Sequence, residues 1–288
     1  MIEIGSPVLR WVGHARVEGA PAVALGAGPL GDRRMVPLTG GQVTGAWNGV
    51  VLAGGADWQC VHPDGVVTLS ARYPVQLDDG RTVCFVARGA RPAEAADGRF
   101  STSLLLEGET KDNSAGTVYV ADGRKVDGVV EFDIYEVTDA AADDQAMNRV
   151  VTIDVTLSPP VTLSESAGGR RTFIPIRGGS VSGRLDAEIV AGGGDWAVEK
   201  IDESMTIHAH YLIRAADGEV IEVENIGRWR DRRDGSPYFV TAPVFTVADG
   251  AHAWLRSSTF IGMAHEVDQT RVLIDVYAVD VAHAAETR

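Results

Sequence analysis

One eight-residue segment occurs twice in this chain, and that repeat constrains the fold more than any other feature. The sequence VLAGGADW at residues 51–58 returns as IVAGGGDW at residues 189–196. At this offset of 138 residues (195 minus 57), segment 37–89 matches segment 175–227 at 17 of 53 positions without a gap. Chance would give roughly one identity in 15 to 20 positions. The chain therefore contains two copies of one module, as a repeat at fixed spacing indicates.

Both copies have the pattern of an all-β protein. Short apolar segments alternate with Gly, Pro and Asp-Gly, and no segment shows sustained helical periodicity. Asp64-Gly65 and Asp79-Gly80 predict hairpin turns. Closure into a barrel protects the edges of many short strands, so we predict two tandem small antiparallel β-barrels, or strongly curved sandwiches, packed as a pseudo-two-fold pair. In the first copy the predicted strands cover 8–17, 33–38, 42–46, 50–53, 58–61, 66–75, 82–87 and 128–137, with a Gly/Pro-rich loop at 21–32.

The repeat also predicts the domain boundaries. The first barrel repeat is expected at residues 1–138 and the second at 150–288. Residues 139–149 contain few β-forming side chains and are predicted to be a linker with at most one short helix. Segment 272–277 corresponds to segment 130–135 at an offset that has grown to 142, which places the extra residues in a loop before the last strands.

Composition excludes several classes of function. With 26 basic and 40 acidic residues the net charge is −14, and nucleic-acid binding would need a basic surface. The chain has neither a basic, apolar leader nor a membrane-length apolar segment, so we expect a soluble cytoplasmic protein of bacterial type. Cys60 and Cys84 are expected to be reduced thiols. Nucleotide-binding and serine-hydrolase motifs are absent from the sequence, and we expect no cofactor and no metal.

A second group of shared residues resembles a known family. In the first copy these are Arg33, Pro37, Gly40-Gly41, Gly54 to Gln59, Asp64-Gly65, Ala71 to Tyr73 and Asp79-Gly80. In the second they are Arg170-Arg171, Pro175, Gly178-Gly179, Gly192 to Trp196, Tyr211, Asp217-Gly218, Asn225 to Arg228, Tyr238 to Phe245, Ala253 to Leu255 and Val276-Tyr277. The pattern is similar to that of the domain-of-unknown-function 3237 (DUF3237, UPF0311) family. The resemblance implies β-barrel domains, usually single-copy, suspected of handling small organic molecules, and it supplies no agreed catalytic residues.

The two copies differ on one predicted strand. Thr68, Ser70 and Arg72 of the first copy become Thr206, His208 and His210 in the second. Residues two apart on a strand share a face, so both imidazoles project from one side, while the other side, which carries Tyr211, is apolar and predicted to pack in the core. The histidines could act as general acid and base, or they could belong to a solvated polar face. A metal site is a third alternative, but a third ligand at suitable spacing is missing, since Glu219 lies after the Asp217-Gly218 turn and His252 and His265 are distant loop candidates.

Further candidate site residues either occur in both copies or are more polar in the second copy than in the first. Asp57 and Asp195 follow glycines that permit close approach, and each could orient a histidine, accept a proton or cap its own turn. The remaining candidates for substrate binding are Arg33, Arg72, Arg171 and Arg228, Trp58, Trp196 and Trp254, Tyr73, Tyr211 and Tyr238, and Asn225. Each has a structural alternative. Arginines could pair with buried carboxylates, tryptophans could pack in a core, and tyrosines could pack with the hydroxyl hydrogen-bonded. Segment 229–243, which carries Tyr238, is predicted to be a mobile flap over a barrel mouth.

Two functions follow from these features. In the first, a barrel pocket, mainly of the second repeat, binds a small aromatic or polyketide-like molecule, and His208, His210 and Asp195 transfer protons without a cofactor. The reaction would be an isomerisation, dehydration, cyclisation or lyase step, with Arg171 or Asn225 holding the oxyanion. In the second, the barrels bind small molecules without chemistry. The protein is expected to be a monomer with pseudo-dimeric domains or a homodimer.

Overall fold

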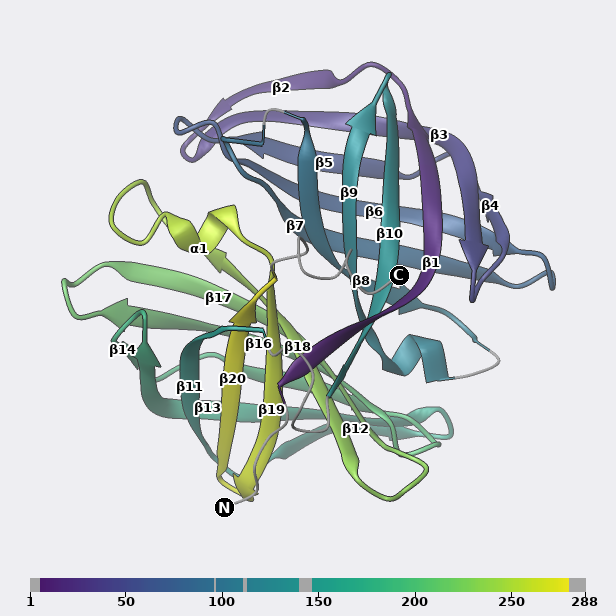
Figure 1. The fold of residues 1–288 in the computed structure, drawn as a ribbon. Helices are drawn as coiled ribbons and strands as arrows, with labels where there is room; N and C mark the ends of the chain where they lie inside the picture. Colours follow the sequence, from purple (N-terminus) through teal and green to yellow (C-terminus); the bar gives the residue numbers. More distant parts are fainter. Residues whose placement is uncertain (1–5, 96, 111–112, 140–146, 280–288) are drawn as a thin grey trace. The chain divides into compact units, whose positions relative to one another are not determined.

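The fold is all-β, as the sequence predicted. The computed structural model describes residues 6–95, 97–110, 113–139 and 147–279, and strands account for 69% of the chain. Every strand pairing in these residues is antiparallel, and the strands form two sheets, one from each repeat (Figure 1). Each sheet curls into a closed barrel of eight strands. None of the helices in the described residues has the length and apolar character needed to cross a lipid bilayer.

The first barrel is one continuous sheet that closes on itself. Its order is β1-β10-β9-β8-β7-β6-β4-β3-β2, with β5 between β3 and β6, and pairing of β1 with β3 completes the ring. A short 3₁₀ helix, η1 (Asn113–Gly116), precedes β9. The strands are β1 (Pro7–Gly19), β2 (Val23–Gly28), β3 (Gly31–Gly45), β4 (Gly49–Val51), β5 (Ala56–Val61), β6 (Val67–Leu77), β7 (Thr82–Arg91), β8 (Arg99–Glu107), β9 (Val118–Val126) and β10 (Val129–Asp139).

The second barrel repeats this topology. Its order is β11-β20-β19-β18-β17-β16-β14-β13-β12, with β15 between β13 and β16, and pairing of β11 with β13 closes it. A four-residue helix, α1 (Trp254–Ser257), precedes β19. The strands are β11 (Arg149–Leu157), β12 (Val161–Ser166), β13 (Gly169–Gly183), β14 (Ala187–Ile189), β15 (Gly194–Glu199), β16 (Met205–Ala215), β17 (Val220–Asp231), β18 (Pro237–Thr246), β19 (Phe260–Asp268) and β20 (Arg271–Ala278).

Glycines permit the closure of each barrel. Gly41 lies on β3 opposite Val17, with φ at +145°, and a Cβ there would collide with the carbonyl oxygen of Arg16 on β1. Gly179 has the same φ, and its Cβ would collide with the backbone of Asp154 on β11. A side chain at either position would push the two closing strands apart, which explains why the Gly-Gly pair recurs in both copies.

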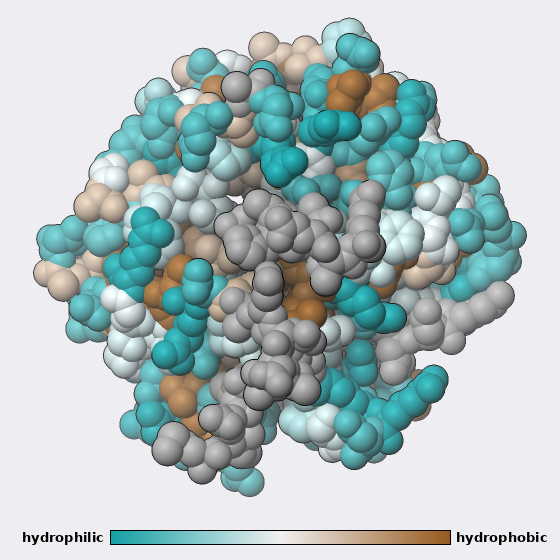
Figure 2. Space-filling view, in the orientation of Figure 1, coloured by the Kyte–Doolittle hydropathy of each residue, from teal (hydrophilic) through white to brown (hydrophobic). Residues whose placement is uncertain are grey.

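Alternation along the strands separates an apolar interior from a polar exterior. On β16, Ala209, Tyr211 and Ile213 are buried, whereas His210, Leu212 and Arg214, which alternate with them, are exposed. This confirms that the Tyr211 side of the strand faces the core. The face shown in Figure 2 is correspondingly dominated by hydrophilic residues, with apolar residues scattered among them.

One segment of the second repeat belongs to the compact unit of the first barrel. Contacts divide the chain into two units, and Asp249–Thr259 clusters with Leu9–Thr138. Within this unit Arg256, 3% exposed, donates a 2.6 Å hydrogen bond to Asp64 at the β5–β6 turn and also pairs with Asp249. The Thr259 hydroxyl donates a 2.8 Å hydrogen bond to the carbonyl of Ser101. These contacts tie the segment to the first barrel.

Several predicted elements differ from the structure. Residues 21–32 contain the strand β2 instead of only a loop, because an edge strand needs pairing on one side alone, which β3 supplies. The prediction assigned no strand between residues 88 and 127, where β8 and β9 lie. Most of the predicted flap 229–243 is a paired hairpin and not a loop, since β17 and β18 remain paired as far as Asp231 and Pro237. Residues 140–146 of the predicted linker lie outside the described residues.

Candidate functional site

The first barrel encloses a cavity of about 700 Å³. Strands β3, β5 and β6 form one wall, and β7 to β10 form the other. Small residues leave this space open, because Ala71, Ala87 and Ala121 all line it. Most of the remaining lining is aliphatic or aromatic. Ligand pockets in proteins typically have 300–1,000 Å³ and such a lining.

A chain of polar side chains crosses the cavity wall. The Arg34 Nε donates a 2.7 Å hydrogen bond to Gln59 Oε1, and Gln59 Nε2 donates a 2.5 Å hydrogen bond to Asp57 Oδ2. All three residues line the cavity. They face inward because Arg34 lies opposite Gln59 on the paired strands β3 and β5, and opposite residues share a face. The guanidinium and the carboxyl group are thus connected through an amide that orients both.

The Asp57 carboxyl group has an unusual environment. Burial raises its pKa above the ordinary range, although the Gln59 hydrogen bond, the Ser70 backbone and the charges of Arg34 and Lys125 oppose the shift. Its second oxygen, Oδ1, is shielded from solvent and accepts no well-formed hydrogen bond from the described residues. An acceptor without a donor makes the charged form costly. Asp57 therefore holds a proton more readily than an ordinary aspartate.

Tyr73 lines the same cavity. It is 3% exposed, and burial, reinforced by the nearby Asp57 charge, raises the pKa of its phenol. The hydroxyl therefore stays protonated at neutral pH and is available as a hydrogen-bond donor. Gly55, just before β5, lies against the backbone of Tyr73 on β6, where a Cβ would collide, so this glycine allows the chain to pass close to Tyr73. This contact gives the repeated Gly-Gly run a role in building the site.

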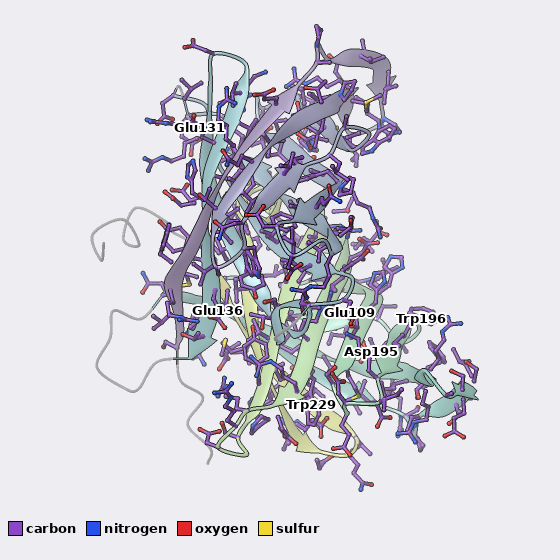
Figure 3. All side chains as sticks on the ribbon, turned by 90° about the vertical axis from the view of Figure 1, so that its right-hand side faces the viewer. Glu109, Glu131, Glu136, Asp195, Trp196 and Trp229 are labelled. Carbon is purple, nitrogen blue, oxygen red and sulfur yellow. The ribbon has the colours of Figure 1, made fainter. Side chains whose placement is uncertain are left out.

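The second barrel keeps the carboxylate and the tyrosine but changes their surroundings. Burial alone raises the pKa of Asp195 to about 7. The Tyr211 hydroxyl, Asn225 Oδ1 and Thr241 Oγ1 are buried without a hydrogen-bond partner in the described residues. Figure 3 labels Asp195 on β15 and Trp229 on β17. The inward residues Arg34, Gln59 and Arg91 of the first barrel correspond to Thr172, Ala197 and Trp229 in the second, by the register of the paired strands.

Comparison with known proteins accounts for the duplication. The family model described as "Protein of unknown function (DUF3237)" matches residues 7–137 and again residues 146–279. The chain belongs to the DUF3237 family. Each DUF3237 match covers one of the two repeats, so the tandem arrangement inferred from the self-match is confirmed.

Individual DUF3237 relatives match half of the chain. The UPF0311 protein blr7842 of Bradyrhizobium diazoefficiens is 31% identical over 143 residues, which cover 45% of this chain and 93% of the relative. Among solved structures, the protein of unknown function RPA1785 from Rhodopseudomonas palustris is 27% identical, with a TM-score of 0.44, and covers 48% of this chain and 100% of that chain. An enzyme from Penicillium herquei is 17% identical, with a TM-score of 0.39, and covers 48% and 99%.

The two histidines singled out in the second DUF3237 repeat lie on the outer face of their strand. His210 is exposed, and its Nε2 lies 2.7 Å from Glu222 Oε1. His208 is half-buried and lies opposite Trp196 and Ile226, on the face away from Tyr211. The structure therefore does not bring the histidines together with Asp195, because the strand places them on opposite sides of the barrel wall.

Several other predicted site residues also lie outside the barrels. Arg33 and Arg171 are exposed and pair with neither Asp57 nor Asp195 in the described residues. Trp58 and Trp196 are 48% and 42% exposed, so neither is a core residue. Arg72 pairs with Glu107 on the outer surface.

Arg228, Tyr238 and Trp254 are the last three candidates. Arg228 is buried, and its Nη1 donates a 3.2 Å hydrogen bond to the carbonyl of Gly227. Tyr238 is 1% exposed, and the Arg230 guanidinium lies 4.5 Å from its ring centre. Trp254 begins α1, in the segment that clusters with the first barrel. None of these three lines the first-barrel cavity.

Most of the polar residues that line the cavity were not predicted from the sequence as site residues. Arg34, Gln59, Arg91 and Lys125 were not selected, although Asp57 and Tyr73 were. The alternation on β3 carried a usable signal, since Arg34 shares a face with Val36 and Leu38 while Arg33 lies on the other face. A comparison of charged residues between the two copies also indicates Arg34, because the second copy has the uncharged Thr172 at the corresponding position.

Proposed function

We propose that the first barrel binds a small apolar organic molecule and transfers protons on it without a cofactor, with Asp57 as the group that takes and returns the proton. The observation that carries this proposal is the cavity of about 700 Å³ with Asp57 and Tyr73 in its wall. The site differs from the one predicted from sequence, which placed the chemistry mainly in the second repeat.

The proton step follows from the two side chains. The desolvated Asp57 carboxylate is a stronger base than a solvated one, and it would accept a proton from a carbon next to a carbonyl group. The C–H bond breaks, an O–H bond forms on Asp57, and the electron pair moves to the carbonyl oxygen as an enolate. Tyr73 and Arg34 would donate hydrogen bonds to that oxygen. Return of the proton to another atom completes an isomerisation, and the same enolate would lead to dehydration, cyclisation or lyase reactions.

A second function, binding without chemistry, is favoured by the lining of the cavity. Val36, Leu69, Phe100 and Leu104 surround the polar residues and are inert in proton transfer. Apolar contact of this kind is sufficient for a binding or carrier protein. The two functions share the cavity and differ in whether the bound molecule exchanges protons.

A larger side chain that fills the first-barrel cavity is expected to weaken ligand binding. Ala71 lines the cavity, and its counterpart Ala209 is packed in the second barrel with 8% exposure. We expect A71F to weaken binding of a two-ring aromatic probe, 2-naphthoate or its neutral amide 2-naphthamide, by at least about tenfold, which is about 1.4 kcal/mol. The matched variant A209F should retain binding while losing about 1–3 kcal/mol of stability through overpacking.

Titration calorimetry and urea unfolding measure the two effects. If A209F does not fold, the smaller A209L serves as the control. Unchanged affinity in A71F, or no binding of either probe to the wild-type protein, would contradict the proposed function.

A further inference from the structure

We infer that the molecule bound in the first barrel is an anion, an aromatic or alicyclic compound with a carboxylate or an equally acidic group. This inference rests on the proposed function of the same cavity and adds the chemical class of its ligand. It is carried by the charged side chains of the wall.

Three cations line the cavity without a carboxylate partner. Arg34, Arg91 and Lys125 form no ion pair with an Asp or Glu side chain among the described residues. Exposed arginines elsewhere in the chain do pair, as Arg170 does with Glu199 and Arg214 with Glu188. Cations around a hollow that are in contact with no carboxylate can bind an anion, because none of their ion-pairing positions is already taken by an Asp or Glu side chain of the described residues.

Three acidic residues, Asp57, Asp97 and Asp127, also line the cavity, but among the described residues none of them forms an ion pair with Arg34, Arg91 or Lys125. Asp97 is exposed and lies 3.9 Å from the Arg99 guanidinium, and Asp127 is exposed beside a turn. The charges of Arg34 and Lys125 both act on the Asp57 carboxyl group and oppose the rise in its pKa that burial causes. The chain as a whole carries a charge of −14, so unpaired cations at one cavity run against its overall composition.

The second barrel lacks these cations. Its side chains at the positions of Arg34, Arg91 and Lys125 are Thr172, Trp229 and Glu266. The cationic wall is therefore not a requirement of the barrel fold, because a homologous barrel in the same chain closes without it. The difference indicates that the first barrel is specialised for a charged ligand.

The cavity also restricts the rest of the ligand. Tyr73, Leu104 and Phe132 are buried and form apolar wall, whereas Lys125 is exposed at the rim. A guanidinium group binds carboxylates through two parallel hydrogen bonds. The ligand would thus direct its ring toward Tyr73 and its anionic group toward Arg34 and Lys125.

Paired probes test the charge preference. We expect 2-naphthoate to bind the wild-type protein at least tenfold more tightly than 2-naphthamide, with the preference falling as salt increases. R34Q and K125Q should each reduce this preference severalfold. R124Q removes the same charge from the exposed neighbour of Lys125 on the opposite face of β9 and should leave the preference unchanged. K125Q keeps the test valid if R34Q disturbs Gln59 and Asp57.

The outcomes separate the two claims. Equal binding of both probes, or a preference that survives R34Q and K125Q, would overturn the anionic ligand and leave the proposed function intact. Failure of both probes to bind would overturn the proposed function itself. A loss of preference in R124Q equal to that in K125Q would show only general electrostatic attraction and would also refute the specific site.

Discussion

Replacing Asp57 by Asn is expected to slow proton exchange on a bound carbon acid by about 10²- to 10⁴-fold, the usual contribution of a general base. The amide has nearly the same shape and still accepts the Gln59 hydrogen bond, but it cannot take a proton. Because burial raises the pKa of Asp57, wild-type exchange should fall as pH decreases through that raised pKa, since protonation removes the base. D57N should lack this pH dependence.

The measurement is deuterium exchange in D2O followed by proton NMR. Phenylpyruvate and benzoylacetate combine an aromatic ring, a carboxylate and an acidic C–H group, so they match the proposed chemistry of the cavity. D195N is the matched control, since it makes the same change in the second barrel, and it should retain wild-type exchange. Exchange by D57N at the wild-type rate would remove Asp57 from the mechanism. Absence of exchange of either compound by wild-type protein would leave binding without chemistry.

The second large effect concerns stability. Asp195 has a pKa of about 7 in the folded protein against an ordinary value of 3.8, so the folded state binds more protons than the unfolded state between these values. The free energy of unfolding should therefore decrease as pH rises from about 4 to about 7, by up to about 4 kcal/mol at 1.36 kcal/mol per pKa unit. D195N removes this penalty and should become more stable than wild type at neutral pH and above.

Urea unfolding of D195N and wild type at several pH values between 5 and 8 measures this effect. The difference in unfolding free energy should grow with pH in favour of D195N, and contributions from other titrating groups cancel in the difference. A difference that does not change with pH would mean that Asp195 titrates near its ordinary value and is solvated.

Much of the fold could be predicted from the sequence. The self-match identified the two repeats, and Asp64-Gly65 and Asp79-Gly80 form the predicted turns, with Gly65 and Gly80 at positive φ. Strands β8 and β9 were missed because residues 88–127 combine charged and Gly-rich stretches with only short apolar runs, and pairing with β7 and β10 decides their structure.

The candidate site was harder to predict, for a physical reason. Alternation defines two faces of a strand, and for β16 it correctly placed Tyr211 inside. This alternation does not show where the interior of a barrel contains a cavity. The size of a cavity depends on all the side chains that point inward from the eight strands at the same height along the barrel axis. The histidines drew attention as chemically versatile residues, yet they lie outside, and the small Ala71 and Ala121 that create the cavity carry no such signal.

The two repeats have diverged in the environment of one shared carboxylate. In the first barrel Arg34 and Gln59 support Asp57, whereas Asp195 in the second has burial as the sole cause of its pKa shift. The sequence predicted the polar pocket mainly in the second repeat, whereas the cavity described above lies in the first barrel. The second barrel keeps the aspartate and the tyrosine but has Thr172, Ala197 and Trp229 where the first has Arg34, Gln59 and Arg91.

The central claim is that the first barrel is the ligand site, and a crystal structure of the protein with 2-naphthoate tests it most directly. The account predicts the naphthalene ring inside the first barrel beside Tyr73, with the carboxylate in contact with the Arg34 guanidinium. A well-occupied ligand found only in the second barrel, or only on the outer surface near His208 and His210, would contradict it.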